Sequence, residues 1–515
     1  MIAKNKYGQY FTVAPIADFM VSLISHSKTS KVLEPSCGKG VFIDKLVDSG
    51  FTNISAYEID KKLATNYDFV QYSSFLEVST QEKYDVIIGN PPYIRWKNLE
   101  PELKGELQDN ELWNKYFNSL CDYLFIFILK SIEHLSSGGE LIFICTEYWL
   151  NTTHSSPLRD YMCSNGYFSD IYHFNETPLF EKVTASFIIF RYIKSSERIE
   201  TIKLHRYMKG KKQPTERELL EEDSFVSFKI PHFQKGKRWI LADLETQSKL
   251  MKFERACISP KSDSLFEDLL HTIGDYCDIG NGMVSGLDIA FQIKETSNLS
   301  EDESKCLIPV LKAKDLAPYI QKSSSTYIFI SEKISASDFK VKYPNLHNHF
   351  SPYLEKLDKR YKYNKDIPYW EFVFPRNQKL FEKEEAKIFI PCKERISNKQ
   401  YFRFCYAHPG FFPTQDVTAI VRKNQCRESI EYILAFLNNK RVFDWLTLNG
   451  IVKGNIIEFS EAPISKIPFR RIDWKIPYEK KLHDDITKEV QAYLLDKDES
   501  HIDTVNKLFN MLFDE

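Results

Sequence analysis

The sequence lacks the features that indicate a disulfide framework, a zinc site or a membrane anchor. Its ten cysteines include no C-x-x-C pair and no histidine partner at zinc-ligand spacing, so we expect reduced thiols and no metal site. No apolar run approaches the roughly 20 residues that span a bilayer, and the first residues, Met1 to Tyr7, lack the apolar core of a signal peptide. We therefore expect a cytoplasmic protein with no membrane part.

An excess of charge of one sign is also absent. The net charge of -2 neither supports nor excludes nucleic acid as a partner, because binding depends on where charge lies. With 515 residues, 43% of them hydrophobic, the chain is long enough for two or three domains.

The N-terminal half contains a glycine loop between a strand and a helix. Lys31–Glu34 reads as a short strand that runs into Pro35-Ser36-Cys37-Gly38-Lys39-Gly40, and a helix follows with Phe42 and Ile43. This is the opening unit of a nucleotide-type fold, in which glycines let the backbone approach a ligand. The loop is not G-x-G-x-x-G and has no Walker lysine-serine pair, which favours an adenosyl or amino-acid moiety over a phosphate.

An acidic residue ends the next predicted strand. Asn53–Tyr57 is followed by Glu58-Ile59-Asp60, with Glu58 24 residues after Glu34. Such folds hydrogen-bond ribose hydroxyls at this position, so we assign that role to Glu58; the alternative is a cap on the following helix. Further on, Phe75 in Ser74-Phe75 is a candidate to cover an adenine ring.

The most informative stretch is Asn90-Pro91-Pro92-Tyr93, which follows the apolar run Tyr84–Gly89. The run reads as a buried parallel strand, and the two prolines force a rigid turn whose backbone offers only carbonyl acceptors. Asn90 adds a side-chain acceptor and Tyr93 adds a flat aromatic face, a set that fits a planar substrate with an exocyclic amine. The alternative is a proline turn with a structural asparagine cap.

The remaining elements of this half predict a sheet of about seven strands. We expect helices from Pro15, over Leu124–Leu135 and after a loop at Thr146–Ser155 with Ser156 as N-cap, and strands at Glu140–Cys145, Tyr167–Phe174 and Ala185–Tyr192. The loop Thr177–Thr184 between the last two strands carries Phe180.

These residues, in this order, resemble the γ-class DNA adenine-N6 methyltransferases of the TaqI type, the modification enzymes of type II restriction systems. The resemblance implies an α/β, Rossmann-like class I methyltransferase domain with a mostly parallel seven-stranded sheet. It implies that Asn90, Pro91, Pro92 and Tyr93 hold the target adenine and that Phe180 supplies a second stacking face. It also implies S-adenosylmethionine as cofactor, bound by Thr12, Glu34, Pro35, Ser36, Cys37, Gly38, Gly40, Glu58, Ile59, Asp60, Ser74, Phe75, Asn90 and Pro92.

The chain departs from this family at Ser74. The family usually has an acidic residue there that contacts the amine of the cofactor's adenine. Either Asp68 substitutes from nearby, or the contact is weaker or mediated by water.

The resemblance also divides the chain. It implies a catalytic domain at residues 1–240 and a mixed α+β DNA target-recognition domain at 241–475. In the remaining segment, 476–515, two single apolar stripes at helical spacing predict two helices packed on the recognition domain. From Thr201, basic residues such as Lys203 and Lys209 surround the acidic Glu216–Asp223, which reads as a linker or cleft rim. Candidates for DNA contact in the second domain are Lys312, Arg360, Tyr369, Trp370, Arg376, Arg395 and Lys453.

The function expected from these features is methylation of adenine N6 in duplex DNA. Double-stranded DNA is the expected partner, with a cognate restriction endonuclease acting separately, and the enzyme is expected to be a monomer. Alternatives are a protein-glutamine or RNA methyltransferase with the same Asn-Pro-Pro-Tyr turn, and a non-catalytic DNA specificity subunit. A nuclease site of the E-x-K form at Glu385-Ala386-Lys387 is a third alternative.

Overall fold

The structure is a computed structural model that describes residues 10–63, 65–180, 185–210, 212–258, 270–362, 365–396, 399–453 and 455–513. The end of the predicted Phe180 loop, 181–184, the side chain of Lys453 and parts of the second domain lie outside this description. The chain divides into two compact units, Met1–Gln247 with Lys453–Asn455, and Ser248–Val452 with Ile456–Glu515. The main division thus falls seven residues after the expected boundary at residue 240.

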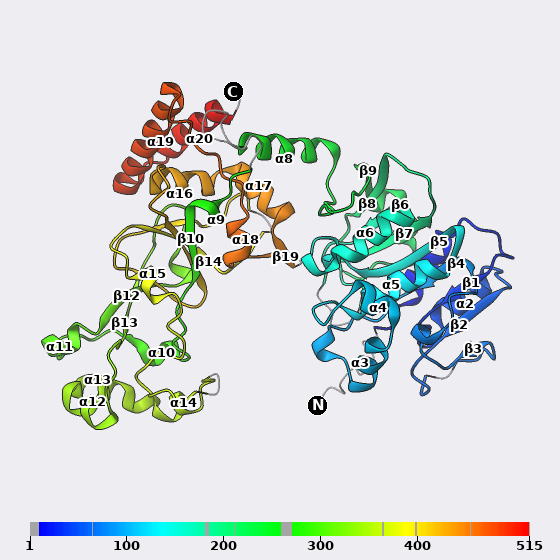
Figure 1. The fold of residues 1–515 in the computed structure, drawn as a ribbon, viewed down its shortest axis with the longest axis horizontal. Coiled ribbons are helices and arrows are strands. Elements are labelled where there is room, and N and C mark those ends of the chain that lie inside the picture. Colours follow the sequence, from blue (N-terminus) through cyan, green and yellow to red (C-terminus); the bar gives the residue numbers. More distant parts are fainter. Residues whose placement is uncertain are drawn as a thin grey trace. The chain divides into compact units, whose positions relative to one another are not determined.

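The first unit is built on one large sheet (Figure 1). Within the described residues it has nine strands, in the order β3-β2-β1-β4-β5-β7-β6-β8-β9. The strands are β1 (Val32–Glu34), β2 (Ile54–Tyr57), β3 (Val70–Gln71), β4 (Tyr84–Gly89), β5 (Leu135–Thr146), β6 (Gly166–His173), β7 (Phe187–Lys194), β8 (Thr201–Tyr207) and β9 (Phe225–Pro231). The strands from β3 to β5 are parallel, and β7 lies antiparallel between β5 and β6.

This order reverses at β1, as in doubly wound nucleotide-binding folds. The predicted Rossmann-like, mostly parallel sheet is therefore confirmed, and the seven strands expected form its core.

The prediction of a linker or cleft rim from Thr201 was wrong. Strand β8 continues the sheet parallel to β6, and β9 pairs antiparallel with β8. Ile202 and Leu204 are fully buried, while Lys203 between them is exposed. Buried apolar and exposed polar residues alternate here, as is typical of a half-buried strand, but the exposed positions are charged and the segment was therefore interpreted as surface. Between the two strands, α7 (Glu216–Leu220) begins with a capping box of Thr215 and Glu218.

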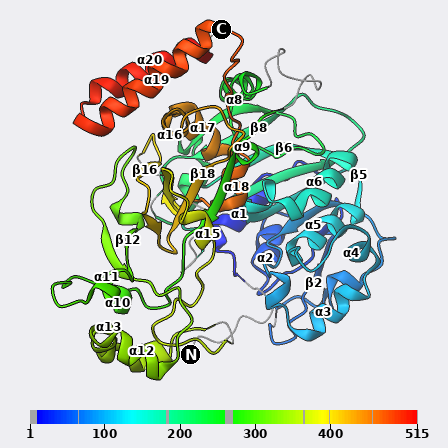
Figure 2. The same ribbon diagram turned by 60° about the vertical axis from the view of Figure 1, so that its left-hand side comes forward.

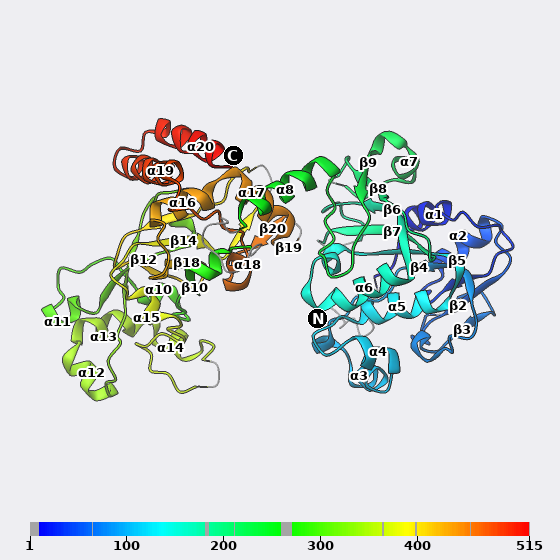
Figure 3. The ribbon, with the colours of Figure 1, turned by 45° about the horizontal axis from the view of Figure 1, so that its top comes forward.

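Helices cover both faces of the sheet (Figure 3). One face packs against α1 (Ala14–Ser22), α2 (Val41–Asp48) and α7 through a core that includes Val86, Ile88 and Ile142. The other face packs against α3 (Pro101–Gln108), α4 (Glu111–Tyr116), α5 (Tyr123–His134) and α6 (Ser156–Asn165), with Ile87 and Leu141 in its core. Successive residues of β4 and β5 thus face opposite layers, and because both layers are apolar the strands read as continuous hydrophobic runs.

Two local predictions were wrong in detail. Strand β5 begins at Leu135 rather than at Glu140, because a bulge accommodates the glycines between the pairs Tyr84–Leu135 and Val86–Glu140. Helix α6 has Ser155 rather than Ser156 as its N-terminal flanking residue. The Ser155 hydroxyl donates to the carbonyl of Trp149 at 2.5 Å instead of capping the helix.

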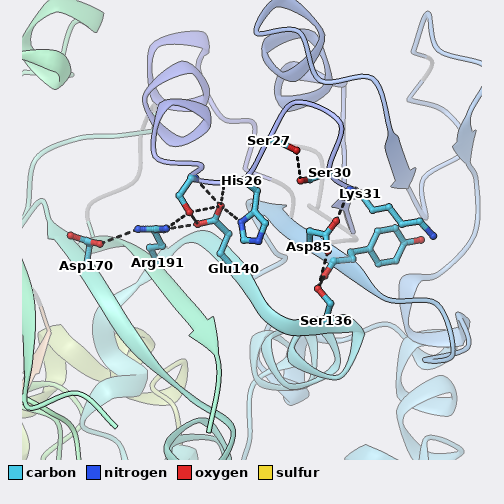
Figure 4. Close-up of polar contacts among 11 residues, drawn as sticks. His26, Ser27, Ser30, Lys31, Asp85, Ser136, Glu140, Asp170 and Arg191 are labelled. Carbon is cyan, nitrogen blue, oxygen red and sulfur yellow. Dashed lines mark hydrogen bonds and ion pairs between the residues drawn. The ribbon is translucent and has the colours of Figure 1, made fainter. Parts of the chain in front are cut away.

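A buried ion network ties the segment after α1 to the sheet (Figure 4). The Glu140 carboxylate is fully buried and accepts hydrogen bonds from Arg191 Nε at 2.5 Å and from the Ser25 backbone N–H at 2.8 Å. His26 Nδ1 lies 2.9 Å from the same carboxylate, and Asp170 lies 3.7 Å from Arg191. The network joins β5, β6 and β7 to the segment after α1.

The second unit contains three small sheets (Figure 1). Their orders are β10-β18-β14-β16, β11-β13-β12-β17 and β15-β20-β19 within the described residues. The strands are β10 (Cys277–Asn281), β11 (Gln292–Ile293), β12 (Leu307–Leu311), β13 (Ser325–Ile328), β14 (Lys387–Pro391), β15 (Lys393–Arg395), β16 (Cys405–Ala407), β17 (Phe412–Pro413), β18 (Val417–Arg422), β19 (Ile451–Lys453) and β20 (Ile456–Glu458).

Two groups of helices pack around these sheets. One group is α10 (Asp288–Phe291), α11 (Glu301–Ser304), α12 (Ala336–Lys342), α13 (Pro344–Phe350), α14 (Leu354–Asp358) and α15 (Gln378–Phe381). The other group is α8 (Leu244–Ala256), α9 (Ile273–Tyr276), α16 (Ile430–Asn438), α17 (Lys440–Asn449) and α18 (Glu461–Ser465), with the terminal pair α19 (Pro477–Asp496) and α20 (Glu499–Phe513). The last two pack side by side, and α19 also packs on α16 (Figure 2). The two predicted tail helices are confirmed.

Candidate active site

A pocket opens at the carboxyl ends of β1, β2 and β4, where the strand order reverses. Ligands bind at this position in open α/β sheets. The pocket is lined by Tyr10, Phe11, Thr12, Glu34, Pro35, Ser36, Cys37, Gly38, Lys39, Val41, Phe42, Asp44, Glu58, Ile59, Ser74, Phe75, Asn90, Pro92, Leu103, Tyr123 and Phe127. Most residues predicted to bind the cofactor are therefore brought together here, whereas Gly40 and Asp60 are not among the lining residues.

The glycine loop holds Glu58, a buried residue, in the wall of the pocket. The Gly38 N–H donates to Glu58 Oε2 at 2.7 Å, and the Asp60 N–H donates to Glu58 Oε1 at 2.8 Å. Gly38 and Gly40 have φ values of 56° and 87°, a backbone conformation that favours glycine. Asp60 and the loop thus orient Glu58, and each carboxylate oxygen retains lone pairs that can accept from a ligand hydroxyl.

Glu34 is buried at the floor of the pocket and incompletely bonded. Its Oε2 atom has no hydrogen-bond partner among the described residues, although the side chain lines the pocket. Burial raises the pKa of the Glu34 carboxyl well above its usual range, and the nearby Glu58 and Asp44 raise it further. A ligand with a positive charge or an N–H donor at this point would satisfy the free oxygen.

The far end of the pocket is mainly aromatic. Phe75 is buried and packs near Phe127, with ring centroids 5.5 Å apart. Leu103, Tyr123 and Phe127 also line this end and were missed from the sequence, because on helices α3 and α5 they read as ordinary core residues. Asp68 is exposed and does not line the pocket, so it does not replace an acidic residue at Ser74.

The side-chain amide of Asn90 is fixed in one orientation. Its Nδ2 donates to the Tyr10 carbonyl at 2.7 Å and to Thr12 Oγ1 at 3.1 Å, while its Oδ1 accepts from the Tyr93 hydroxyl. The same Tyr93 hydroxyl contacts the Ile144 carbonyl at 2.5 Å and can use it as an alternative acceptor. The Thr12 segment therefore sets which end of Asn90 is the acceptor.

An aromatic cluster stands beside Asn90. The ring centroid of Tyr10 lies 5.9 Å from that of Tyr93 and 6.2 Å from that of Phe180, and Phe180 lies 4.9 Å from Phe187. Phe180 is thus brought close to the motif from a loop far along the chain. Tyr10 was missed from the sequence because an isolated tyrosine before Thr12 carries no periodic signal. Pro91 is buried in the turn.

Three further observations concern metal ions, disulfides and membranes. Across the described ranges, no group of three or more His, Cys, Asp or Glu side chains is placed to hold a metal ion. The ten cysteines are all free. Among the same residues, no helix is both long and apolar enough to cross a membrane.

The candidates for DNA contact in the second unit fall into two groups. Trp370 is buried and stacks on Phe339 with ring centroids 4.4 Å apart, and Arg360 is buried with its guanidinium bonded to the carbonyls of Ser285, Pro368 and Glu371. Both were wrong as DNA contacts, because Trp370 is packed inside the fold and the buried guanidinium of Arg360 is bonded to backbone carbonyls. Among the partly or fully exposed candidates, Arg395 is the most accessible, and Lys312, Tyr369 and Arg376 are half-buried.

The E-x-K alternative is also contradicted. The Lys387 side chain is buried, and its Nζ donates to the backbone carbonyls of Lys383 and Glu385 at 2.6 and 2.9 Å. A lysine bonded in this way serves the fold of β14 and is not available to a scissile phosphate.

Comparison with known proteins gives consistent matches. Residues 24–180 match the family model described as Eco57I restriction-modification methylase. The chain is 46% identical to the type II methyltransferase M.HindII of Haemophilus influenzae over 98% of its own length and 97% of the relative. It is 44% identical to the type II methyltransferase M.HincII of Haemophilus influenzae, with the same coverage of both chains.

A solved structure shares the fold. The restriction-modification enzyme MmeI, determined in complex with DNA, matches 98% of this chain and 72% of its own with a TM-score of 0.61 at 11% identity. The likeness extends over both units of the present chain.

Proposed function

The chain belongs to the type II methyltransferases of restriction–modification systems, and from this premise we propose that it methylates N6 of a flipped-out adenine in duplex DNA with S-adenosylmethionine as the methyl donor. The observation that carries the proposal is the fixed acceptor of Asn90 between a ligand pocket and an aromatic cluster.

The chemistry of the pocket fits the cofactor. Glu58, held by two backbone N–H groups, is suited to ribose hydroxyls, and the free oxygen of Glu34 is suited to the ammonium of the methionine part. Phe75, Leu103 and Phe127 supply apolar surface for the adenine ring. When bound, S-adenosylmethionine supplies a methyl group made electrophilic by its sulfonium.

The residues beside the pocket are suited to an exocyclic amine. The adenine amine is a poor nucleophile because its lone pair is conjugated with the ring. Asn90 Oδ1 and a backbone carbonyl of the proline turn would accept its two N–H hydrogens and favour a pyramidal, more nucleophilic nitrogen. Asn90 Oδ1 becomes free for this role when the Tyr93 hydroxyl turns to the Ile144 carbonyl alone. No strong base is required before transfer.

A base within a duplex cannot reach this position, so the target adenine must leave the stack. The rings of Tyr93 and Phe180 would then stack on it, with Tyr10 beside both, and offset an unstacking cost of a few kcal/mol. In this proposal Tyr10 is displaced or tilted as the base enters. The second unit would read the DNA sequence, with Arg395 and Arg376 as candidate contacts.

We further propose that the enzyme acts as a monomer and protects DNA from a separate cognate endonuclease. The test is methyl transfer from labelled S-adenosylmethionine to unmethylated genomic DNA, with RNA and total protein as parallel acceptors. N6-methyladenine in a single sequence context is the expected product and would also reveal the recognition site. Label in RNA or protein, or a different methylated base, would refute the proposal.

A substitution separates chemistry from cofactor binding. Asn90→Ala should lower the transfer rate by about 100-fold or more, because one preorganised polar contact to the transition state is lost. Binding of S-adenosylmethionine should stay largely intact. Loss of cofactor binding would show that the turn has a structural role only.

A further inference from the structure

We propose that Glu106 determines the preference of the cofactor pocket for a 6-amino purine, by fixing the hydroxyls of Ser74 and Tyr123 as hydrogen-bond acceptors. The inference rests on the proposed function, since it assumes that the purine of the cofactor occupies the Phe75 end of the pocket. Glu106 itself lies behind the lining and acts as a positioning residue.

The hydrogen bonds give the direction of each proton. The Ser74 hydroxyl donates to Glu106 Oε1, and the Tyr123 hydroxyl donates to Glu106 Oε2 at 3.4 Å. An ionised carboxylate has no proton to give, so both hydroxyl protons point away from the pocket toward Glu106. Ser74 and Tyr123 line the pocket, so what they present to a ligand is oxygen lone pairs.

The Ser74 hydroxyl oxygen can accept one more hydrogen bond. Its oxygen already accepts from the Leu76 N–H at 3.2 Å, which leaves one lone pair for a ligand. An acceptor at this point is matched by the 6-amino group of adenine. The 6-oxo oxygen of hypoxanthine would instead face the Ser74 oxygen, and neither atom could donate a hydrogen bond to the other. Leaving these acceptors unpaired in a buried pocket costs binding free energy.

Residues of helices α3 and α5 fix the place and the charge environment of Glu106. Leu103 and Leu107 of helix α3 are buried in the same core as α5, and the Tyr123 hydroxyl of α5 bonds to Glu106, so the carboxylate lies at the back of the pocket. Lys130, also on α5, donates to the Leu76 carbonyl and lies 5.6 Å from the centre of the Phe75 ring. Burial, with the nearby Glu77, raises the pKa of Glu106, and the hydrogen bonds from Ser74 and Tyr123 and the charge of Lys130 limit that rise.

The test compares two ligands that differ at one position. Binding of S-adenosylhomocysteine and of its 6-oxo counterpart, S-inosylhomocysteine, is measured by calorimetry on the full-length wild type, Glu106→Gln and Ser74→Ala. Glu102→Gln, on the exposed side of the same helix, is the matched control. The wild type and the control should prefer the 6-amino ligand by about 10- to 100-fold.

Glu106→Gln should reduce that ratio to a few-fold. A glutamine amide can donate to Ser74 Oγ, and the hydroxyl proton is then free to turn toward the pocket and meet a 6-oxo group. Ser74→Ala removes the acceptor without altering Glu106 and should also lower the ratio, so the inference stays testable if Glu106→Gln folds poorly.

The outcomes separate this inference from the proposed function. An unchanged ratio in both folded variants would overturn it, as would equal binding of the two ligands by the wild type. If the wild type binds neither ligand, the proposed cofactor is wrong, and the inference falls with it.

Discussion

Substitution of Tyr93 separates two roles that the Asn-Pro-Pro-Tyr turn combines. Its ring is proposed to stack on the flipped adenine, while its hydroxyl contacts Asn90 Oδ1 and the Ile144 carbonyl. Tyr93→Phe keeps the ring and removes the hydroxyl, and Tyr93→Ala removes both. If stacking is the main role, the two variants should differ strongly.

The magnitudes follow from the interactions lost. Loss of a stacked aromatic face costs about 1–3 kcal/mol per base, so Tyr93→Ala should weaken binding of the extruded base by about 5- to 150-fold. Tyr93→Phe loses a hydrogen bond worth about 0.5–1.5 kcal/mol of stability, but leaves Asn90 Oδ1 free for the substrate amine. We expect its transfer rate to stay within about fivefold of wild type.

The assay is single-turnover methyl transfer on a duplex that contains the recognition site, with parallel binding measurements on a duplex carrying 2-aminopurine at the target. Fluorescence of the 2-aminopurine reports extrusion of the base, and cofactor affinity serves as the control for folding. A Phe variant as defective as the Ala variant would show that the hydroxyl, rather than the ring, is required. A fully active Ala variant would remove Tyr93 from the base site altogether.

Three further predictions test other parts of the molecule. Phe180→Ala should weaken binding of DNA with an extrudable target base by about 5- to 150-fold without changing cofactor affinity, and unchanged kinetics would exclude Phe180 from the base site. Arg191→Met leaves the Glu140 charge buried without its cation and should lower the free energy of unfolding of the first unit by about 3–5 kcal/mol, measured by denaturant unfolding. The double variant with Glu140→Met should regain much of that free energy. An unchanged free energy of unfolding in Arg191→Met would contradict the network. Because burial raises the pKa of Glu34, its ionised form is lost as the pH falls through that raised pKa, so S-adenosylmethionine affinity should decrease as the pH falls. In Glu34→Gln the calorimetric affinity should be lower but flat with pH, and an equally steep dependence would assign the titration to another group.

Much of the catalytic unit could be predicted from local signals. The strand Tyr84–Gly89 has the predicted bounds, because an unbroken apolar run before two prolines allows few other structures. The glycine loop and Glu58 follow from their fixed distance along a strand–loop–helix unit. The second unit was less predictable, since its three small sheets join strands that are far apart in the sequence, such as β10 and β18.

The sequence by itself determined the elements whose information is local: the strands and turns at Glu34, Glu58 and Asn90, and the order in which they occur. The tertiary structure decided which residues from distant elements join them. Glu106 reaches Ser74 only because α3 and α5 share one core, and Tyr10 meets both Tyr93 and Phe180 only because the Thr12 segment and the loop after β6 converge above β4. It also decided that Arg360 and Trp370 are structural, since burial depends on what packs around a side chain and not on its type.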